Sequence, residues 1–112
     1  MLDGLSHTLE RYMDLLSARQ KLVSSNIANA DTPGYRTLDI DFQSEFRSAL
    51  QGASPQPFEV AGLQVKNDGN NVSLDREARL LAENGMQFNL ASNLLRSKIQ
   101  KVKEAIQSGS GT

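Results

Sequence analysis

The stretch that decides the fold runs from Ser24 to Arg36 and reads SSNIANADTPGYR. It begins like the end of an amphipathic helix, fills with asparagines, and then reaches Pro33 and Gly34. Proline has no amide proton and disfavours helical backbone in the residue before it, whereas glycine accepts a positive φ. The Pro-Gly pair therefore predicts that a helix ends here in a type II turn. The asparagines have two candidate roles, a catalytic loop or a joint between segments of the chain.

Upstream of this stretch, apolar side chains recur at alternating steps of three and four residues from Leu2 to Ala30. This spacing predicts one helix over residues 5–29, with an apolar stripe that is interrupted at Arg19 and Asn26. An asparagine within such a stripe lowers stability, but its amide must find a hydrogen-bond partner and so can fix the register of neighbouring segments. That property favours the joint.

Downstream of the turn, residues 37–72 are predicted to form a linker. Apolar and acidic residues alternate from Leu38 to Phe42, which indicates a short extended segment, and the four-residue spacing from Phe42 to Leu50 predicts a short helix. The remainder of the linker holds prolines, glycines and a polar run, with apolar residues in alternation within 58–65. We expect a loop there, or at most a small β-hairpin.

The most regular pattern lies in the last third of the chain. Steps of four and three residues give a continuous seam over residues 74–106, interrupted only by the small Gly85 and Ser92. This seam predicts a second long helix over residues 73–107 that packs on another helix. The tail, residues 108–112, consists of serine, glycine and threonine and is expected to be flexible.

The predicted fold class is all-α, with two long terminal helices in an elongated, coiled-coil-like hairpin and a short irregular or small β-hairpin middle. The segments are an N-terminal helix and turn motif (1–36), the linker (37–72), the C-terminal helix (73–107) and the tail (108–112). Helices of this size are about 38 to 50 Å long, and a lone pair leaves one flank of each stripe in water. Neighbouring subunits are expected to cover an assembly seam that consists of Leu9, Leu16, Val23, Leu74, Leu81, Phe88, Leu95, Ile99, Val102 and Ile106.

The composition argues against several classes of function. A formal charge of -1 offers no general attraction to nucleic acid or to an anionic membrane. Hydrophobic residues make up 38% and aromatic residues 5% of the chain, so a large self-contained core is hard to build. Without cysteine there are no disulfides or thiolate metal sites. The start lacks the pattern of a secretory signal, and no run approaches the ~18 apolar residues of a membrane span.

Few residues offer catalytic or metal chemistry. His7 is the only histidine and lies on a polar helix face, where a solvated surface residue is expected. Asp39 and Asp41 could begin a calcium loop, but the sixth position from Asp39 is Ser44 instead of glycine and the twelfth is Leu50 instead of glutamate. We therefore expect no catalytic residues, no cofactor, no metal, no small-molecule substrate and no nucleic-acid partner.

The unbroken run from Ser25 to Tyr35 closely resembles the N-terminal signature of the bacterial flagellar axial proteins, the rod and hook family. The run from Asp68 to Glu77, followed by Ala82-Glu83-Asn84, is similar to the proximal rod members of this family. The residues that carry the family motif and turn are Ser25, Asn26, Ile27, Ala28, Asn29, Asp31, Thr32, Pro33, Gly34 and Tyr35.

This resemblance implies a structural subunit of the periplasmic rod in the flagellar basal body, which self-assembles, helps transmit motor torque and so serves motility. Its implied partners are copies of itself, other rod proteins, the adaptor that joins the rod to the membrane ring, and the flagellar type III export apparatus, which would export the chain without a cleaved signal peptide. On the residues alone, two other hypotheses stay open. One is a helical adaptor protein that pairs with another helical partner outside the flagellum, and the other is an enzyme, against which the single histidine counts.

Overall fold

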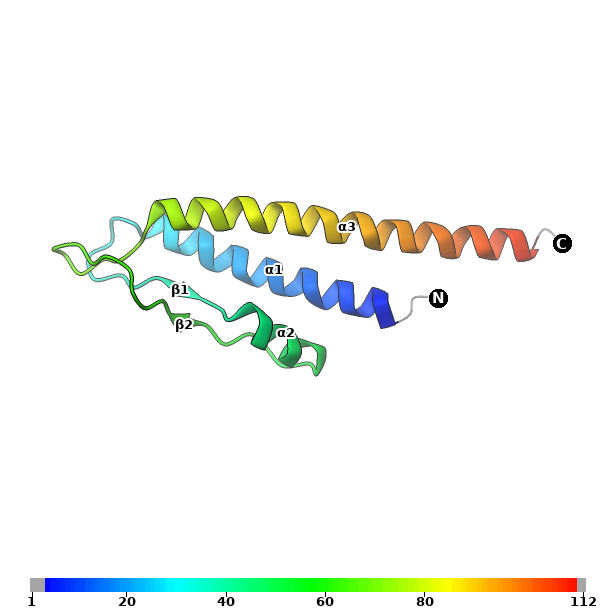
Figure 1. Cartoon of the computed structure of the whole chain (residues 1–112), viewed down its shortest axis with the longest axis horizontal. Helices are drawn as coiled ribbons and strands as arrows, with labels where there is room; N and C mark the ends of the chain where they lie inside the picture. Colours follow the sequence, from blue (N-terminus) through cyan, green and yellow to red (C-terminus); the bar gives the residue numbers. More distant parts are fainter. Residues whose placement is uncertain (1–3, 111–112) are drawn as a thin grey trace.

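The computed structural model describes residues 4–110, which form an elongated helical hairpin with principal extents of 72 × 25 × 17 Å (Figure 1). The elements, in order, are α1 (Gly4–Ala28), β1 (Leu38–Asp39), α2 (Phe42–Leu50), β2 (Phe58–Glu59) and α3 (Leu74–Ser110). The two long helices run antiparallel, so α1 begins and α3 ends toward the same end of the molecule. The predicted hairpin of two long terminal helices is confirmed.

Local sequence signals account for the helix ends. α1 lies within one residue of the predicted range at each end, and its last turn is followed by Pro33, which cannot continue a helix. α3 begins after Ser73, whose Oγ accepts a hydrogen bond from the amide of Arg76 at 3.2 Å, as an N-cap serine does. α3 extends to Ser110, three residues beyond the predicted end at residue 107. Residues 111 and 112 of the expected tail lie outside the described residues.

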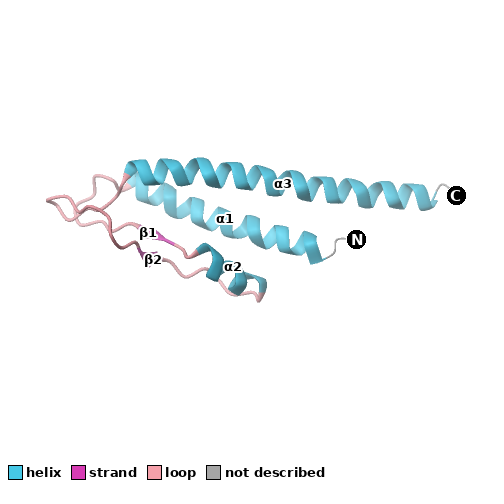
Figure 2. Ribbon diagram, in the orientation of Figure 1, coloured by secondary structure: helices cyan, strands magenta, loops and turns pink. Residues whose placement is uncertain are grey.

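The middle of the chain forms a small antiparallel sheet of β1 and β2, and α2 lies between these strands in the sequence (Figure 2). Leu38 lies opposite Glu59, and Asp39 lies opposite Phe58. A small β element was predicted, but β2 pairs with β1 and not with a strand inside residues 58–65. The segment with β1 lies against α1, where Thr37 and Asp39 are buried. Its backbone is therefore held in place to pair with the returning chain, and the carbonyl of Thr37 accepts a hydrogen bond from the amide of Val60 at 3.0 Å.

The core lies on both sides of α1. Leu15 and Leu16 are each 1% exposed, although successive helical residues point about 100° apart. Both are buried because α3 covers one face of α1 while α2 and the sheet cover another. Tyr12 adds edge-to-face contacts with Phe42 at 5.4 Å and Phe46 at 5.7 Å between ring centroids.

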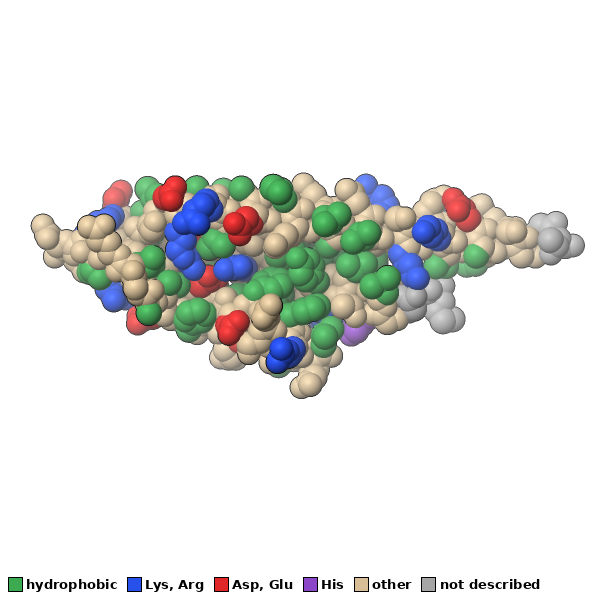
Figure 3. Space-filling view, in the orientation of Figure 1, with side chains coloured by type: hydrophobic (Ala, Val, Ile, Leu, Met, Phe, Trp, Pro, Cys, Tyr) green, Lys and Arg blue, Asp and Glu red, His purple; other side chains and the backbone are tan. Residues whose placement is uncertain are grey.

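The outer surface of this thin molecule retains many apolar side chains. They gather along the middle of the face shown in Figure 3, where α1, α2 and α3 meet. Within residues 4–110, no helix has both the length and the hydropathy needed to cross a membrane.

Candidate functional site

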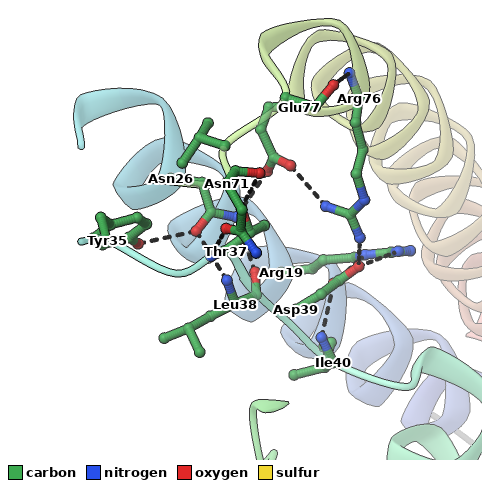
Figure 4. A network of polar contacts seen from close by, with 12 residues as sticks. Arg19, Asn26, Tyr35, Thr37, Leu38, Asp39, Ile40, Asn71, Arg76 and Glu77 are labelled. Carbon is green, nitrogen blue, oxygen red and sulfur yellow. Dashed lines mark hydrogen bonds and ion pairs between the residues drawn. The ribbon is translucent and has the colours of Figure 1, made fainter. Parts of the chain in front are cut away.

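Asn26 is the buried centre of the joint, two residues before α1 ends (Figure 4). Its side chain is 1% exposed and forms four hydrogen bonds. The Nδ2 atom donates to the carbonyl of Leu38 at 2.9 Å and to Oε1 of Glu77 at 2.8 Å. The Oδ1 atom accepts from the hydroxyl of Tyr35 at 2.9 Å and from the amide of Leu38 at 3.2 Å. One side chain therefore ties the end of α1 to the turn, to β1 and to α3.

Four charged residues form a balanced cluster beside Asn26. Arg19 of α1 donates through Nε and Nη2 to the two carboxylate oxygens of Asp39, each at 2.9 Å. Arg76 of α3 also donates to Asp39, and its Nη1 donates to Oε2 of Glu77 at 2.6 Å. Asp39 and Glu77 are almost fully buried. Because two guanidinium groups face two carboxylates, no charge in the cluster is left without a partner.

Contacts within the cluster shift the pKa values of Asp39 and Arg76. Burial acts to raise the pKa of Asp39, but hydrogen bonds from Arg19, the Ile40 amide and Arg76 outweigh it and hold the pKa below its ordinary value. Burial acts to lower the pKa of Arg76, but its bonds to Glu77 and Asp39 outweigh that effect and raise the pKa. A carboxylate with a lowered pKa and two occupied oxygens is a poor general base. The cluster is suited to holding segments together.

Two asparagines before α3 complete the joint. The Nδ2 atom of Asn70 donates to the carbonyls of Asn29 at 2.9 Å and Thr32 at 2.8 Å, in the turn that follows α1. The Oδ1 atom of Asn71 accepts from the amide of Thr37 at 2.6 Å. The loop before α3 is therefore bonded to the turn after α1.

The Pro33-Gly34 turn has the predicted geometry. Gly34 has a φ of 74°, as the third position of a type II turn requires, and the amide of Tyr35 bonds to the carbonyl of Thr32 at 3.2 Å. The Gly34 amide donates to the carbonyl of Asp68 at 2.8 Å. A second turn crosses here, because a Cβ on Gly69 would lie 3.4 Å from the Cα of Gly34. The polar stretch is a joint between two turns and two helices.

The rest of the family motif lies at the surface of the joint. Ser25, Ile27, Ala28, Asp31, Thr32, Pro33 and Gly34 are exposed, and Asn29 and Tyr35 are half-buried. Six residues that hold the joint together were not predicted from the sequence, namely Arg19, Asp39, Asn70, Asn71, Arg76 and Glu77. One signal was available, since Arg19 interrupts an apolar stripe and a charged residue there needs a partner.

The residues of the predicted assembly seam differ between the two helices. In α1, Leu16 and Val23 are each 1% exposed and Leu9 is half-buried. In α3, the exposed fractions are 57% for Leu74, 42% for Leu81, 36% for Phe88, 37% for Ile99 and 61% for Ile106, while Leu95 and Val102 are half-buried. The subunit itself covers the α1 part of the seam and leaves most of the α3 part in solvent.

The residues of α3 that pack on α1 form a row next to the seam. Glu77, Asn84 and Ala91 are buried at intervals of seven residues, and we call them the inner row. Seam residues Leu81 and Phe88 each precede an inner-row residue by three positions, which places them about 60° away around the helix. The α3 seam therefore runs along one flank of the hairpin.

Shallow apolar grooves lie on both flanks of the inner row. The seam-side groove has a volume of about 450 Å³ and is lined by Leu16, Ser17, Gln20, Lys21, Asn84, Gly85, Phe88 and Asn89. The groove on the other flank has a volume of about 270 Å³ and is lined by Thr8, Leu9, Tyr12, Phe46, Gln87, Leu90, Ala91 and Leu94. Leu90 of this groove is 62% exposed, and Met86, about one turn earlier on α3, is 71% exposed. Contiguous exposed apolar surface of this kind is typical of an interface with other proteins.

Comparison with known proteins identifies the family of this chain. A family model described as flagella basal body rod protein matches residues 10–36. The flagellar basal body rod protein FlgB of Escherichia coli (strain K12) is 32% identical over 137 aligned residues, which cover 97% of this chain and 99% of that protein. FlgB of Yersinia enterocolitica is 29% identical, with 96% and 97% covered, and FlgB of Borreliella burgdorferi is 32% identical, with 75% and 82% covered. The chain therefore belongs to the FlgB family of flagellar basal body rod proteins.

Proposed function

We propose that this chain is a structural subunit that polymerises through its terminal helices into the proximal, periplasmic part of the flagellar rod and helps transmit motor torque. One observation carries the proposal. The inner row of α3 is occupied by α1, yet apolar side chains remain exposed along both of its flanks. Subunits on either side would remove this surface from water, at about 25 cal/mol for each Å² buried.

The joint supports the torque-bearing role. A subunit that transmits torque must keep the angle between its two long helices under load. Asn26, Asp39 and Arg76 each bridge different elements of the joint with short hydrogen bonds, so a change in that angle would break several buried contacts together. Salt bridges at a solvent-exposed site would resist much less.

The proposed partners are further copies of the chain, other rod proteins, the adaptor between rod and membrane ring, and the flagellar export apparatus. Export without a cleaved signal peptide requires a chain that unfolds readily. The subunit is only 17 Å thick along its shortest axis and has a small core, which is consistent with easy unfolding. The α3 part of the predicted assembly seam, which remains exposed, is the surface we propose for contacts in the rod.

A charge placed on the seam tests this function. Leu81 is 42% exposed, so Leu81→Asp should leave the folded subunit nearly unchanged in isolation. In an assembled rod the carboxylate would face an apolar neighbour at a cost of several kcal/mol. We expect export to continue, with few or no rods that contain the variant in isolated basal bodies and with loss of swimming.

The matched control is Asn93→Asp, which adds the same charge at an exposed position of α3 away from the seam. It should assemble as wild type does. Normal numbers of rods built from Leu81→Asp would contradict the seam as an interface. Absence of the tagged wild-type chain from isolated basal bodies would favour a helical adaptor that acts outside the flagellum.

A further inference from the structure

Gly85 in the middle of α3 is not required by the fold of the subunit. Glycine is a poor helix former compared with alanine. The φ of Gly85 is not positive, and a Cβ built on it would meet nothing within 4 Å. Neither backbone conformation nor internal packing therefore calls for glycine here. Gly85 lines the seam-side groove, where a missing side chain lets the backbone of another helix come close.

A second feature of the same groove indicates an occupant. Asn84, the neighbour of Gly85, is only 3% exposed and also lines the groove. Its Nδ2 atom donates to Oε1 of Gln20 at 3.3 Å, but its buried Oδ1 atom has no partner. Buried polar atoms are nearly always hydrogen-bonded in folded proteins. A hydrogen-bond donor on a helix that enters the groove would satisfy this oxygen.

The end of α3 extends past the start of α1, so α1 does not form a groove beside it. α3 has 37 residues and α1 has 25, so α3 is longer by about 18 Å and continues past the start of α1 (Figure 1). Leu5 in the first turn of α1 lies beside Lys98 and Lys101. Beyond this point α3 presents Ile106, which is 61% exposed, on one stripe with Ile99 and the half-buried Val102. We call residues 99–110 the α3 extension.

We infer that the α3 extension of one copy lies in the seam-side groove of the next copy, parallel to the α3 helix of that copy. This inference rests on the proposed function and specifies one contact of the polymer. The groove centres on residues 84–89 and the apolar stripe of the extension on residues 99–106, so successive copies would be offset by about 24 Å along the helix axis.

The two surfaces differ, so the contact is head-to-tail. Each copy supplies one extension and one groove, and such a contact continues into an open chain where an isologous contact would close as a dimer. At the proposed offset, Lys103 of one copy would lie level with Ser17 of the next copy and within one helical turn of Asp14, which continues the row of Ser17 and can pair with it.

Filling the groove is the first test. Gly85→Leu adds a side chain into open space and replaces a poor helix former by a good one, so the melting temperature of the purified chain should stay the same or rise. The same substitution should abolish incorporation into rods in isolated basal bodies and stop swimming. Asn93→Leu adds a leucine at an exposed position of α3 that does not line the groove and should assemble normally. Rods of wild-type number containing Gly85→Leu would overturn the inference.

Disulfide cross-linking is the second test, and it does not depend on a steric variant. The chain has no cysteine, so a Ser17→Cys, Lys103→Cys double variant has one defined pair at two exposed positions. Within one subunit Ser17 lines the groove with Asn89, and Lys103 lies about 21 Å further along α3, too far for an internal disulfide. Oxidised basal bodies should give a reducible ladder of dimers, trimers and longer products, and neither single variant should.

The possible results separate the inference from the proposed function. A dimer from Ser17→Cys alone would indicate an isologous groove contact and overturn the inference. The absence of cross-links in swimming cells whose basal bodies contain the double variant would also overturn the inference. The proposed rod function would stand in that case. If the wild-type chain were absent from basal bodies, both would fail.

Discussion

Replacing Asn26 with aspartate would replace the donor atom at the centre of the joint, Nδ2, with a second acceptor oxygen. In the wild-type chain Nδ2 of Asn26 donates to the carbonyl of Leu38 and, at 2.8 Å, to Oε1 of Glu77. In Asn26→Asp an oxygen takes the place of this nitrogen and meets the Glu77 carboxylate. Because Glu77 is fully buried, salt and water screen the repulsion only weakly.

The size of the effect follows from this geometry. Two ionised carboxylates 2.8 Å apart repel by about 6 kcal/mol at an effective dielectric constant of about 20. Protonation of the new carboxyl group is less costly, since at pH 7 it requires about 4 kcal/mol for a group with an ordinary pKa of about 3.9. The protonated acid has one donor in place of two, which adds about 1 kcal/mol for the acceptor left without a partner. We therefore expect a loss of about 5 kcal/mol at pH 7, a large part of the about 5–15 kcal/mol typical of small domains.

This loss should depend on pH in a specific direction. The pKa of the introduced carboxyl group is raised in the folded state, so the folded state binds one more proton than the unfolded state between the two pKa values. The stability of the variant relative to wild type should therefore rise as the pH falls, by about 1.4 kcal/mol per pH unit and about 3 kcal/mol from pH 7 to pH 5.

Urea unfolding of the purified chains, followed by circular dichroism at pH 5, 6 and 7, measures this difference. Asn93→Asp makes the same chemical change at an exposed site and should unfold as wild type does at each pH. The reasoning is refuted if Asn26→Asp loses less than about 1 kcal/mol at pH 7, or if its loss is the same at pH 5 and pH 7. Either result would mean that the Asn26 amide and the Glu77 carboxylate do not share a buried contact.

Two further substitutions test the turn and the charged cluster. Gly34→Val places a β-branched residue at a φ of 74° and should cost about 1–2 kcal/mol and reduce swimming, whereas Gly34→Asn tolerates this backbone region and should retain most of the stability; equal melts for the two variants would contradict the strained geometry. Asp39→Asn leaves Arg19 and Arg76 without their shared carboxylate and should cost about 3 kcal/mol at pH 7. Because the pKa of Asp39 is lowered on folding, its ion pairs stabilise the wild-type chain above the ordinary aspartate pKa and are lost as the pH falls through the lowered value. The variant should therefore lose less stability than wild type on acidification, and parallel acid-unfolding curves would argue against this role.

The parts of the fold that the sequence predicted depend on local patterns. The three-and-four spacing that ends before Pro33 located α1 to within one residue at each end, and the Pro-Gly pair predicted the positive φ of Gly34. The pairing of β2 with β1 could not be predicted in this way. It depends on where the chain returns alongside α1, and strands of two residues carry too little pattern to select a partner.

The polar joint was predictable only in part for a related reason. Asn26 was expected to need hydrogen-bond partners because it interrupts an apolar stripe, but nothing in its neighbourhood named Glu77, 51 residues away. Glu77 also looks like an ordinary acidic residue in the first turn of a helix, where it suits the helix dipole. Its burial becomes apparent only when α3 lies against α1.

The division of contacts between the two ends of the hairpin has a physical consequence for assembly. Hydrogen bonds are directional, so the polar joint can set the angle and register of α1 and α3 without using the apolar stripe along the flanks of α3. A core large enough to set the same geometry by packing alone would have buried Leu81, Phe88 and their neighbours inside the subunit. If copies of the chain assemble as proposed, burial of these exposed side chains would supply hydrophobic free energy to the contact between copies.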